Sequence, residues 1–450
     1  MMTQIQFTLR SKVYFYESDR GGSLISMTDK KTLSLNADAV EVVNGLQSGW
    51  LTEDEAAEKT NDLNLGYFTL ITMQKAGMLD ARIVNKNKKL FTLSPSPEDS
   101  AFKKQIESGT TYHLNRYAYL HQAEDALLLE SPLTPCRITI FDAKLTGMIH
   151  QLCTGMRLDI AGDDAKTFLS VLIALGIAEP AGMEKENDPM DFWQFHDLLY
   201  YARTLDGKNA YPTGGTYRFR EKRPTIPINR ESVSDTFIAL PEPTEELAES
   251  LNTPFSEVLG MRQSQREFSE NFITLEELGA FFHAAARIKS VQTIPDNGEI
   301  VTMRPSPSGG ARHALEIYPL IKRCEGVPPG AYRYDAANHR LERVPTTPDK
   351  LKKMLEENPY EFLGGESPQI TLNISARIGR TAWKYESIAY KLINQDMGCL
   401  YQTFYLVATA LGLAPCALGS VNTEKLGKAH GIDWSEEPFI GAFTLGKTND

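Results

Sequence analysis

The order of apolar and polar positions repeats within roughly the first two hundred residues. Residues 34–49 align without gaps on residues 140–155, and in both an Asx residue precedes an amphipathic helix that a glycine ends. A second apolar helical run ending at a glycine follows each copy, at residues 69–79 and 168–178. Alternating, strand-like sequence precedes each copy. We therefore expect two small winged-helix-like α+β units; the alternative is a chance likeness between two capped helices.

The amino-acid composition changes after the second copy. Residues 183–245 begin with a polar run, continue with apolar residues at helical spacing around Phe195 and Leu198, and end in a stretch rich in proline and glycine. This composition predicts a helix and then an extended connection that lies on a neighbouring surface. The expected division is a winged-helix-like unit at residues 1–95, a second at 96–182, the connector at 183–245 and a C-terminal domain at 246–450.

The C-terminal domain contains both helical and strand-like patterns. Thr274 and Glu277 form a capping-box signature, which predicts a helix from residue 275 to residue 286. Residues 386–411 form one long helical pattern that is apolar on most sides, so this helix should be buried in a core or between subunits. Strand-like runs lie between and after these helices. The expected fold class is α+β.

Three polar side chains alternate along one segment near the start of this domain. Arg262, Ser264 and Arg266 occupy every second position, so in a strand two guanidinium groups and a hydroxyl group would point the same way, about 7 Å apart. Such a group suits a phosphate. The alternative is an exposed polar strand whose arginines pair with Glu257 or Glu267.

Residues 304–317 combine two prolines, two serines and a Gly-Gly pair and then run into an apolar segment. Small residues and prolines let a backbone approach a flat or charged ligand closely. Arg312 and His313 bring polar groups to the same place. For His313, contact with a substrate and simple hydrogen bonding are equally compatible with the sequence.

Composition narrows the function classes. The chain has 450 residues and a net charge of −11, which disfavours nucleic acid as the main partner. We see no secretory signal and no apolar run long enough to span a bilayer. The five cysteines lack paired spacing, which favours neither a disulfide framework nor a metal site. A cytoplasmic protein with reduced thiols is expected.

Several of these motifs together resemble a known family. The pattern Arg-x-Ser-x-Arg-x-Phe at 262–268, the Pro-Ser-Gly-Gly turn, the long buried helix and Ala-Leu-Gly-Ser at 417–420 resemble the FMN-dependent nitroreductase fold. More narrowly, RPSPSGGARHALEIY and WKYESIAYKL, with the upstream FHDLLYYARTL and GGTYRF, resemble the SagB-type dehydrogenases, which are azoline oxidases of ribosomally made peptide pathways. The two-repeat N-terminal half is similar to the layout of cyanobactin thiazoline oxidases.

The resemblance implies a cofactor site at a homodimer interface. It assigns the FMN phosphate and ribityl chain to Arg262, Gln263, Ser264 and Arg266. It also implies that the turn of Pro307, Ser308 and Gly309 contacts the flavin held mainly by the partner subunit. Backbone groups of Leu418 and Gly419 would lie near the isoalloxazine, and Lys447 would add charge near the phosphate.

The resemblance also implies two catalytic residues. An adjacent Lys-Tyr pair is catalytic in the azoline oxidases, and it falls here on Lys384 and Tyr385. Oxidation of an azoline needs a base that faces the flavin across the substrate, and burial beside cationic groups can bring lysine or tyrosine into the required pKa range. Both side chains can face one ligand only in irregular backbone or at a helix start. The alternative pairs Lys384 with Glu386 or Glu357 and packs Tyr385 in the core.

The implied function is FMN-dependent oxidation of thiazolines or oxazolines in a precursor peptide to thiazoles or oxazoles, with dioxygen as the acceptor and a cyclodehydratase as a further partner. Two alternatives are an NAD(P)H-dependent reductase and an inactive peptide-binding scaffold. Common nitroreductases continue the glycine turn with Asn-x-Gln-Pro-Trp, whereas this chain has Ala-Arg-His-Ala-Leu at 311–315. That departure disfavours simple nitroaromatic or quinone chemistry.

Overall fold

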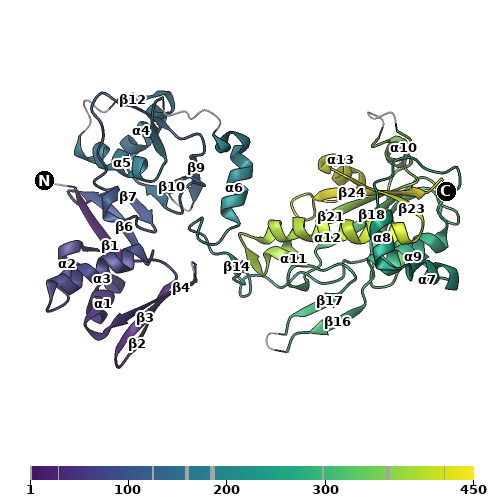
Figure 1. Ribbon diagram of the computed structural model, residues 1–450, viewed down its shortest axis with the longest axis horizontal. Coiled ribbons are helices and arrows are strands. Elements are labelled where there is room, and N and C mark those ends of the chain that lie inside the picture. Colours follow the sequence, from purple (N-terminus) through teal and green to yellow (C-terminus); the bar gives the residue numbers. More distant parts are fainter. Residues whose placement is uncertain are drawn as a thin grey trace. The chain divides into compact units, whose positions relative to one another are not determined.

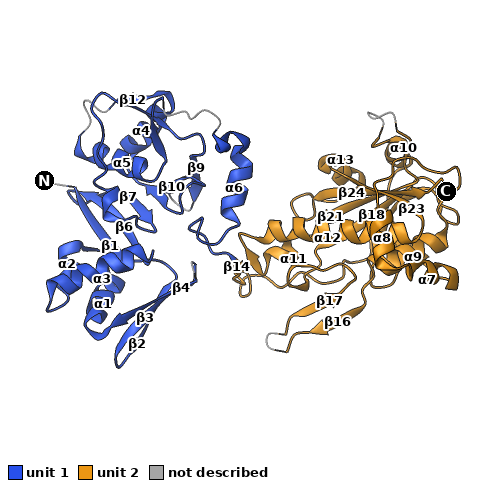
Figure 2. Ribbon diagram, viewed as in Figure 1, with its two compact units in different colours: residues 1–213 blue, residues 214–450 orange. Residues whose placement is uncertain are grey.

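The structure is a computed structural model that describes residues 3–28, 30–123, 126–157, 162–182, 188–295, 298–360, 365–419 and 421–449. It divides into two compact units, residues 1–213 and 214–450 (Figure 2). The boundary between the units falls inside the predicted connector. The finer division at residues 95, 182 and 245 stays a prediction, and residues 183–187 at the start of the connector lie outside the described residues, as does Ser420.

The first unit is built on one antiparallel sheet with the strand order β5-β1-β6-β7-β11-β10-β9 (Figure 1). Its strands are β1 Gln4–Leu9, β5 Leu51–Thr52, β6 Leu79–Asn85, β7 Lys88–Ser94, β9 Tyr119–Ala123, β10 Ala126–Glu130 and β11 Arg137–Ile140. A second sheet has the order β2-β3-β4, and a third has the order β12-β8-β13. Their strands are β2 Val13–Ser18, β3 Gly21–Ser26, β4 Lys31–Asn36, β8 Thr111–Leu114, β12 Met156–Arg157 and β13 Ala178–Pro180.

The predicted repeat is visible in the order of elements. The first copy has α1 (Val40–Ser48), β5, α2 (Glu53–Ala57), α3 (Leu63–Lys75) and β6, and the second has α4 (Ala143–Thr154), β12, α5 (Asp163–Ala174) and β13. The side chains of Asn36 and Asp142 accept the expected capping hydrogen bonds. The two copies share the large sheet, because β7 of the first pairs with β11 of the second.

Helix α6 (Phe195–Arg203) follows the second copy, close to where its helical spacing predicted it. Its last residue, Arg203, places its guanidinium group 3.9 Å from the ring centre of Tyr211. The hydroxyl of Tyr211 donates in turn to the buried Glu130 of β10 at 3.1 Å, which holds the helix on the first unit. The predicted helix of the connector is therefore part of the first unit.

The second unit has a seven-stranded antiparallel sheet with the order β15-β20-β19-β18-β21-β24-β23. Its strands are β15 Phe237–Ala239, β18 Leu315–Ile321, β19 Gly330–Asp335, β20 Arg340–Arg343, β21 Ile370–Ala376, β23 Leu413–Leu418 and β24 Phe439–Lys447. Two small pairs accompany it, β14 Gly214–Gly215 with β22 Tyr385–Glu386, and β16 Ser290–Thr293 with β17 Ile300–Met303.

Helices cover both faces of this sheet. Helices α9 (Leu275–Ala285) and α12 (Ala389–Ala410) pack on one face, and α10 (Pro348–Glu356) and α13 (Thr423–His430) lie on the other (Figure 1). Short helices α7 (Glu245–Leu251), α8 (Phe255–Met261) and α11 (Ile378–Ala382) complete the unit. The capping box at Thr274 is present, so the predicted helix 275–286 is confirmed to within one residue.

Helix α12 explains the long apolar pattern in the sequence. One side of it, including Ile393 and Phe404, is fully buried against the sheet and α9. Tyr390 on another side is 49% exposed. The helix is therefore a core element of this unit, and its exposed side carries mainly polar residues such as Asn394 and Gln402. In the described part of the chain, no helix combines the length and apolarity that crossing a membrane requires.

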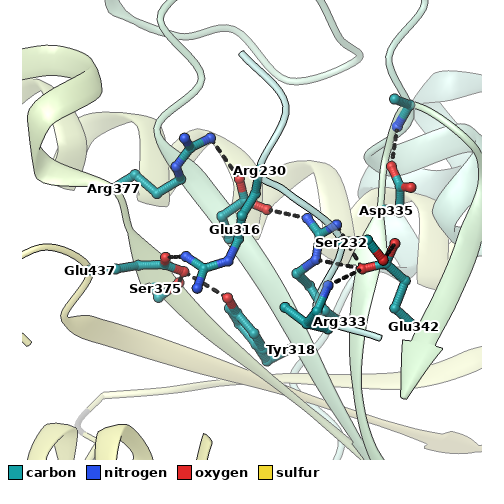
Figure 3. A network of polar contacts seen from close by, with 12 residues as sticks. Arg230, Ser232, Glu316, Tyr318, Arg333, Asp335, Glu342, Ser375, Arg377 and Glu437 are labelled. Atoms are coloured by element: carbon teal, nitrogen blue, oxygen red, sulfur yellow. Dashed lines mark hydrogen bonds and ion pairs between the residues drawn. The ribbon is translucent and has the colours of Figure 1, made fainter. Parts of the chain in front are cut away.

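The extended part of the connector lies on the second unit, as its composition predicted. The indole nitrogen of Trp383 donates to the carbonyl of Arg223 at 2.9 Å, and Arg380 donates to the carbonyl of Ile226 at 2.7 Å. Further along, a polar network fastens residues 230–233 to the sheet (Figure 3).

In that network, Glu437 binds Arg230 and accepts hydrogen bonds from Tyr318 and Ser375, both at 2.8 Å (Figure 3). Arg333 joins Glu316 to Glu342 at 3.2 and 2.8 Å. Because these carboxylates are buried and each has a cationic partner, the network fixes one end of the sheet, from which α11 and the candidate site extend.

Candidate functional site

The two motifs that carried the resemblance meet in space. Gly310 has a φ of +62°, and a Cβ atom added there would lie 2.3 Å from the hydroxyl oxygen of Tyr385. Gly309 is covered from the other side by Leu392 of α12, 3.0 Å from its own Cβ position. The glycine pair is therefore required by close packing between the turn and the Lys-Tyr motif.

A third sequence motif completes this arrangement. Strand β14, the Gly-Gly of GGTYRF, pairs with β22, so that Gly215 lies opposite Tyr385. The backbone N–H of Tyr217 then donates to the carbonyl of Lys384 at 3.1 Å. Since α11 ends at Ala382 and α12 begins at Ala389, Lys384 and Tyr385 lie in the non-helical backbone that the prediction required.

Backbone strain gathers where these motifs meet. Tyr217, Ala311, His313 and Ser387 are non-glycine residues with φ values of +53°, +53°, +43° and +60°. Each such residue costs of the order of 1–3 kcal/mol and persists only when its surroundings impose it. The surrounding packing therefore determines this backbone, as is typical of functional sites.

Lys384 has a buried carboxylate partner that the sequence did not indicate. Its ammonium group donates to Oε2 of Glu299 at 2.9 Å, and Oε1 of Glu299 accepts from Arg312 at 3.3 Å. The Glu299 side chain is only 5% exposed. The pairing with Glu386 or Glu357 considered above is not the one observed. Glu299 comes from the segment before β17, and no motif marks it.

The environment of Lys384 sets its charge. Burial lowers the pKa of Lys384, but hydrogen bonds to Glu299 and Tyr217 and the charge of Glu299 outweigh burial, so the pKa lies above its ordinary value. Burial beside cationic groups can lower the pKa of a lysine, but it does not do so for Lys384, because the nearest charge is a carboxylate. Lys384 is therefore an ammonium ion at neutral pH.

Two arginines lock the turn to α11. Arg312 donates from Nε to the carbonyl of Arg380 at 2.8 Å, and Arg380 donates from Nε and Nη2 to the carbonyl of Arg312 at 3.0 and 2.6 Å. Both side chains are almost fully buried. Burial, and then the neighbouring arginines, lower the pKa of Arg380 to about 9, so it stays charged at neutral pH. Nη2 of Arg312 has no partner among the described residues.

His313 is held neutral beside this pair. Burial, and then the charges of Arg304 and Arg380, lower the pKa of His313 to about 3. Because the imidazole is neutral at physiological pH, it cannot act as a general acid in the imidazolium form. His313 is therefore suited to hydrogen bonding.

The Pro-Ser-Gly part of the turn is fastened to α12 by Asp396. Its carboxylate accepts from the hydroxyl of Ser308 at 2.6 Å and from the backbone N–H of Gly309 at 2.9 Å. Burial raises the pKa of Asp396, although both hydrogen bonds oppose the shift. Pro307 and Ser308 line a cavity of about 20 Å³, the size of a single water molecule. Asp396 is the only acidic residue of α12, and this was the signal that could have identified it.

The segment with alternating polar residues is extended but forms no regular strand. The N–H of Gln265 donates to the carbonyl of Pro415 in β23 at 2.9 Å. Two of the alternating side chains share one partner, since Arg262 lies 5.4 Å from the ring centre of Tyr405 and Ser264 bonds its hydroxyl at 2.8 Å. This agrees with the expectation that positions two apart point the same way.

These residues fit a phosphate group. An open cavity of about 490 Å³ is lined by Gln263, Ser264, Gln265, Arg266, Glu267, Thr448 and Asn449. Among the described residues, neither Arg262 nor Arg266 forms an ion pair, so the proposed pairing with Glu257 or Glu267 is not seen. Arg266 and Ser264 line this cavity, and Arg262 lies beside them over Tyr405 without lining it. A guanidinium group next to a hydroxyl group provides donors that a phosphate needs.

The remaining predicted cofactor residues lie elsewhere in the unit. Lys447, near the end of β24, forms an ion pair with the buried Glu277. Leu418 ends β23 and lines a separate cavity on the sheet face that carries α10 and α13, and Gly419 follows it. Within one chain, the predicted residues therefore border three different cavities, near Arg266, near Ser308 and near Leu418.

Comparison with known proteins agrees with this arrangement. Residues 259–447 match the model of the nitroreductase family. The C-terminal half therefore contains a domain with the nitroreductase fold. Residues 112–210 match the model of the cyanobactin oxidase ThcOx. The predicted resemblance and the α+β fold with a nitroreductase domain are thus confirmed.

Three curated relatives extend the nitroreductase-family comparison. The trifolitoxin-processing protein TfxB of Rhizobium leguminosarum is 23% identical over 67% of this chain and 86% of its own length. The microcin B17-processing protein McbC of Escherichia coli is 28% identical over 35% of this chain and 58% of its own length. The putative nitroreductase MJ1384 of Methanocaldococcus jannaschii is 29% identical over 36% of this chain and 77% of its own length.

Proposed function

We propose that this protein is an FMN-dependent oxidase that converts thiazolines or oxazolines in a ribosomally made peptide into thiazoles or oxazoles. The observation that carries the proposal is the close packing of Tyr385, the second residue of the Lys-Tyr pair, against Gly310 of the turn. The names of the matched cyanobactin oxidase model and of two relatives that process trifolitoxin and microcin B17 support it. The nitroreductase-family match by itself supports the broader class, an oxidoreductase.

The proposed reaction removes two hydrogens from the azoline ring. A proton leaves the ring carbon next to the carbonyl group, and a hydride leaves its neighbour as the ring double bond forms. Bound flavin would supply the hydride acceptor, and dioxygen would reoxidise it. The protein must therefore position the ring, take up one proton and stabilise the negative charge that develops when the proton leaves.

The site divides these tasks between two side chains. Lys384 is a cation, so we assign it the stabilisation of negative charge on the substrate rather than proton abstraction. We assign the proton transfer to Tyr385, whose hydroxyl lies at the turn and whose ring centre is 5.7 Å from the Lys384 ammonium. The buried partner Glu299 would keep that ammonium in place.

The cofactor assignment follows the phosphate fit. Gln263, Ser264 and Arg266, which line this cavity, would hold the phosphate and ribityl chain of FMN together with Arg262, which lies over Tyr405. Lys447 could help only by sharing its ammonium group between Glu277 and the phosphate. Leu418 and Gly419 would approach the isoalloxazine through their backbone. We further propose a homodimer in which Pro307, Ser308 and Gly309 reach the partner's flavin, with the precursor peptide and a cyclodehydratase as partners.

Mass spectrometry of an azoline-containing peptide tests the proposal. The purified protein, without NAD(P)H, should remove the mass of two hydrogen atoms per ring, and Lys384→Ala and Tyr385→Phe should each lose at least about a hundredfold in rate. The adjacent Tyr390 and Lys391 of α12 provide matched controls, because Tyr390→Phe and Lys391→Ala make the same changes outside the site. Full activity of both site variants would refute the catalytic assignment, and activity only with NAD(P)H would favour the reductase.

A further inference from the structure

The cavity near Leu418 lies on the sheet face opposite α12. Its volume is about 610 Å³, within the range of pockets that hold small organic molecules. The sheet contributes its floor, and α10 and α13 contribute its walls. Apolar side chains supply much of the lining: Leu320, Met354, Leu418, Val421, Leu426 and Ala429.

The floor of this cavity contains an unpaired polar group. Asn373 of β21 lines the cavity and is only 4% exposed, and its Nδ2 has no hydrogen-bond partner among the described residues. It lies in register with Ala442, which is in turn opposite Leu418, and both of these also line the cavity. Burial of an unpaired amide is unfavourable, so rotation of this side chain to present Nδ2 to an acceptor atom of a molecule in the cavity would stabilise this position.

The walls carry an excess of positive charge. Four lysines line the cavity: Lys350, Lys353, Lys425 and Lys428. Lys425 pairs with Glu357, which also lines the cavity, and Lys428 pairs with Glu424. Among the described residues, Lys350 and Lys353 form no ion pair. Two uncompensated ammonium groups therefore border an apolar pocket.

We infer that this cavity binds a small organic anion with an apolar body. The anionic group would lie near Lys350 and Lys353, the body against the apolar walls, and an acceptor atom near Nδ2 of Asn373. The inference does not depend on the proposed oxidase activity. The cavity shares only Leu418 with the residues assigned to the flavin, and it lies apart from Lys384 and Tyr385.

Calorimetric titration of the full-length protein with naphthoate tests the inference, with the neutral naphthamide as the uncharged probe of the same shape. Naphthoate should bind to one site per chain and at least about tenfold more tightly than naphthamide. Equal affinity of the two probes, or no binding of naphthoate, would overturn the inference.

Charge-reversal variants of two adjacent lysines of α10 test where the anion binds. Lys353→Glu should weaken naphthoate binding about tenfold. Lys352→Glu makes the same change one residue away, where the side chain does not line the cavity and lies 3.8 Å from Glu356, and it should leave affinity within about twofold. Asn373→Leu, which removes the amide at the floor, should also weaken binding. Equal effects of the two lysine variants would overturn the assignment to this cavity; if Asn373→Leu does not fold, the lysine pair alone decides.

Discussion

Replacing Glu299 by glutamine would test whether its buried charge holds the Lys-Tyr motif. The carboxylate is the anionic partner of both Lys384 and Arg312, whose side chains are 14% and 2% exposed. Glutamine keeps the shape of the side chain but removes its charge. The two cations would then face each other without a counterion, and the pKa of Lys384 would fall.

The expected loss of local stability is large for a single substitution. Breaking a buried ion pair by removing one partner costs about 3–5 kcal/mol. Because Lys384 is not completely buried, we expect the lower end, about 3 kcal/mol, in the local stability of the site. The folded-state pKa of Lys384 is raised, so the stabilisation is fully present below the pKa of an unfolded lysine and is lost only as the pH rises through the higher folded pKa. The effect should therefore be constant around neutral pH.

Hydrogen exchange measured by mass spectrometry is the suitable assay, because the two units need not unfold together. Amides of residues 214–217 and 384–388, which include the β14–β22 pair, should exchange about a hundredfold faster in Glu299→Gln at neutral pH. Glu386→Gln is the matched control. Its nearest cation is Arg218 at 3.9 Å, so it should change exchange by less than about fivefold.

Equal acceleration by the two variants would refute the role of Glu299. A double-mutant cycle with Lys384→Met adds an independent criterion. If Glu299 and Lys384 interact as the geometry indicates, the double variant should lose about 1–3 kcal/mol less than the sum of the single losses. Additive losses would show that Glu299 acts through Arg312 alone.

Three further predictions concern the turn. Gly310→Ala places a methyl group against the hydroxyl oxygen of Tyr385, in left-handed backbone. It should lower the free energy of unfolding by at least about 1–2 kcal/mol and abolish azoline oxidation. Gly260→Ala is the control, because open space surrounds Gly260 and both stability and activity should be unchanged. The pKa of His313 is lower in the folded state than in the unfolded state. Its contribution to stability is therefore present above the unfolded pKa and is lost as the pH falls toward about 3. Between neutral pH and pH about 4, the thermal denaturation midpoint of His313→Asn should fall less than that of the unsubstituted protein. Asp396→Ala removes the acceptor of both Ser308 and the Gly309 N–H and should cost about 1–3 kcal/mol by thermal unfolding; unchanged stability would contradict the fastening role.

Local signals in the sequence predicted local structure well. The capping box at Thr274 and the Asx caps at Asn36 and Asp142 were found in place, because caps depend on residues within three positions of each other. The long buried helix was also predicted within three residues at each end, since its apolar pattern has the helical period.

Pairings between distant segments could not be predicted in the same way. Lys384 and Glu299 are 85 residues apart, and nothing near Glu299 distinguishes it from an exposed acid. The join between the two repeats through β7 and β11 depends on strand register, which no periodicity within one strand specifies. The charge state of Lys384 depends on that distant partner, so the sequence could not predict the direction of its pKa shift.

The sequence alone determined which residues could supply chemistry: a Lys-Tyr pair, a glycine turn and a segment of alternating arginines, each defined by residue type and short spacing. Only the tertiary structure decided how they combine. It places the turn on Tyr385, gives Lys384 a buried counterion, and leaves Arg262 and Arg266 without one among the residues that the structure describes. The physical reason is that ionic state and close packing depend on neighbours brought together by the sheet and by α11 and α12, whereas residue type and helical or strand period are local.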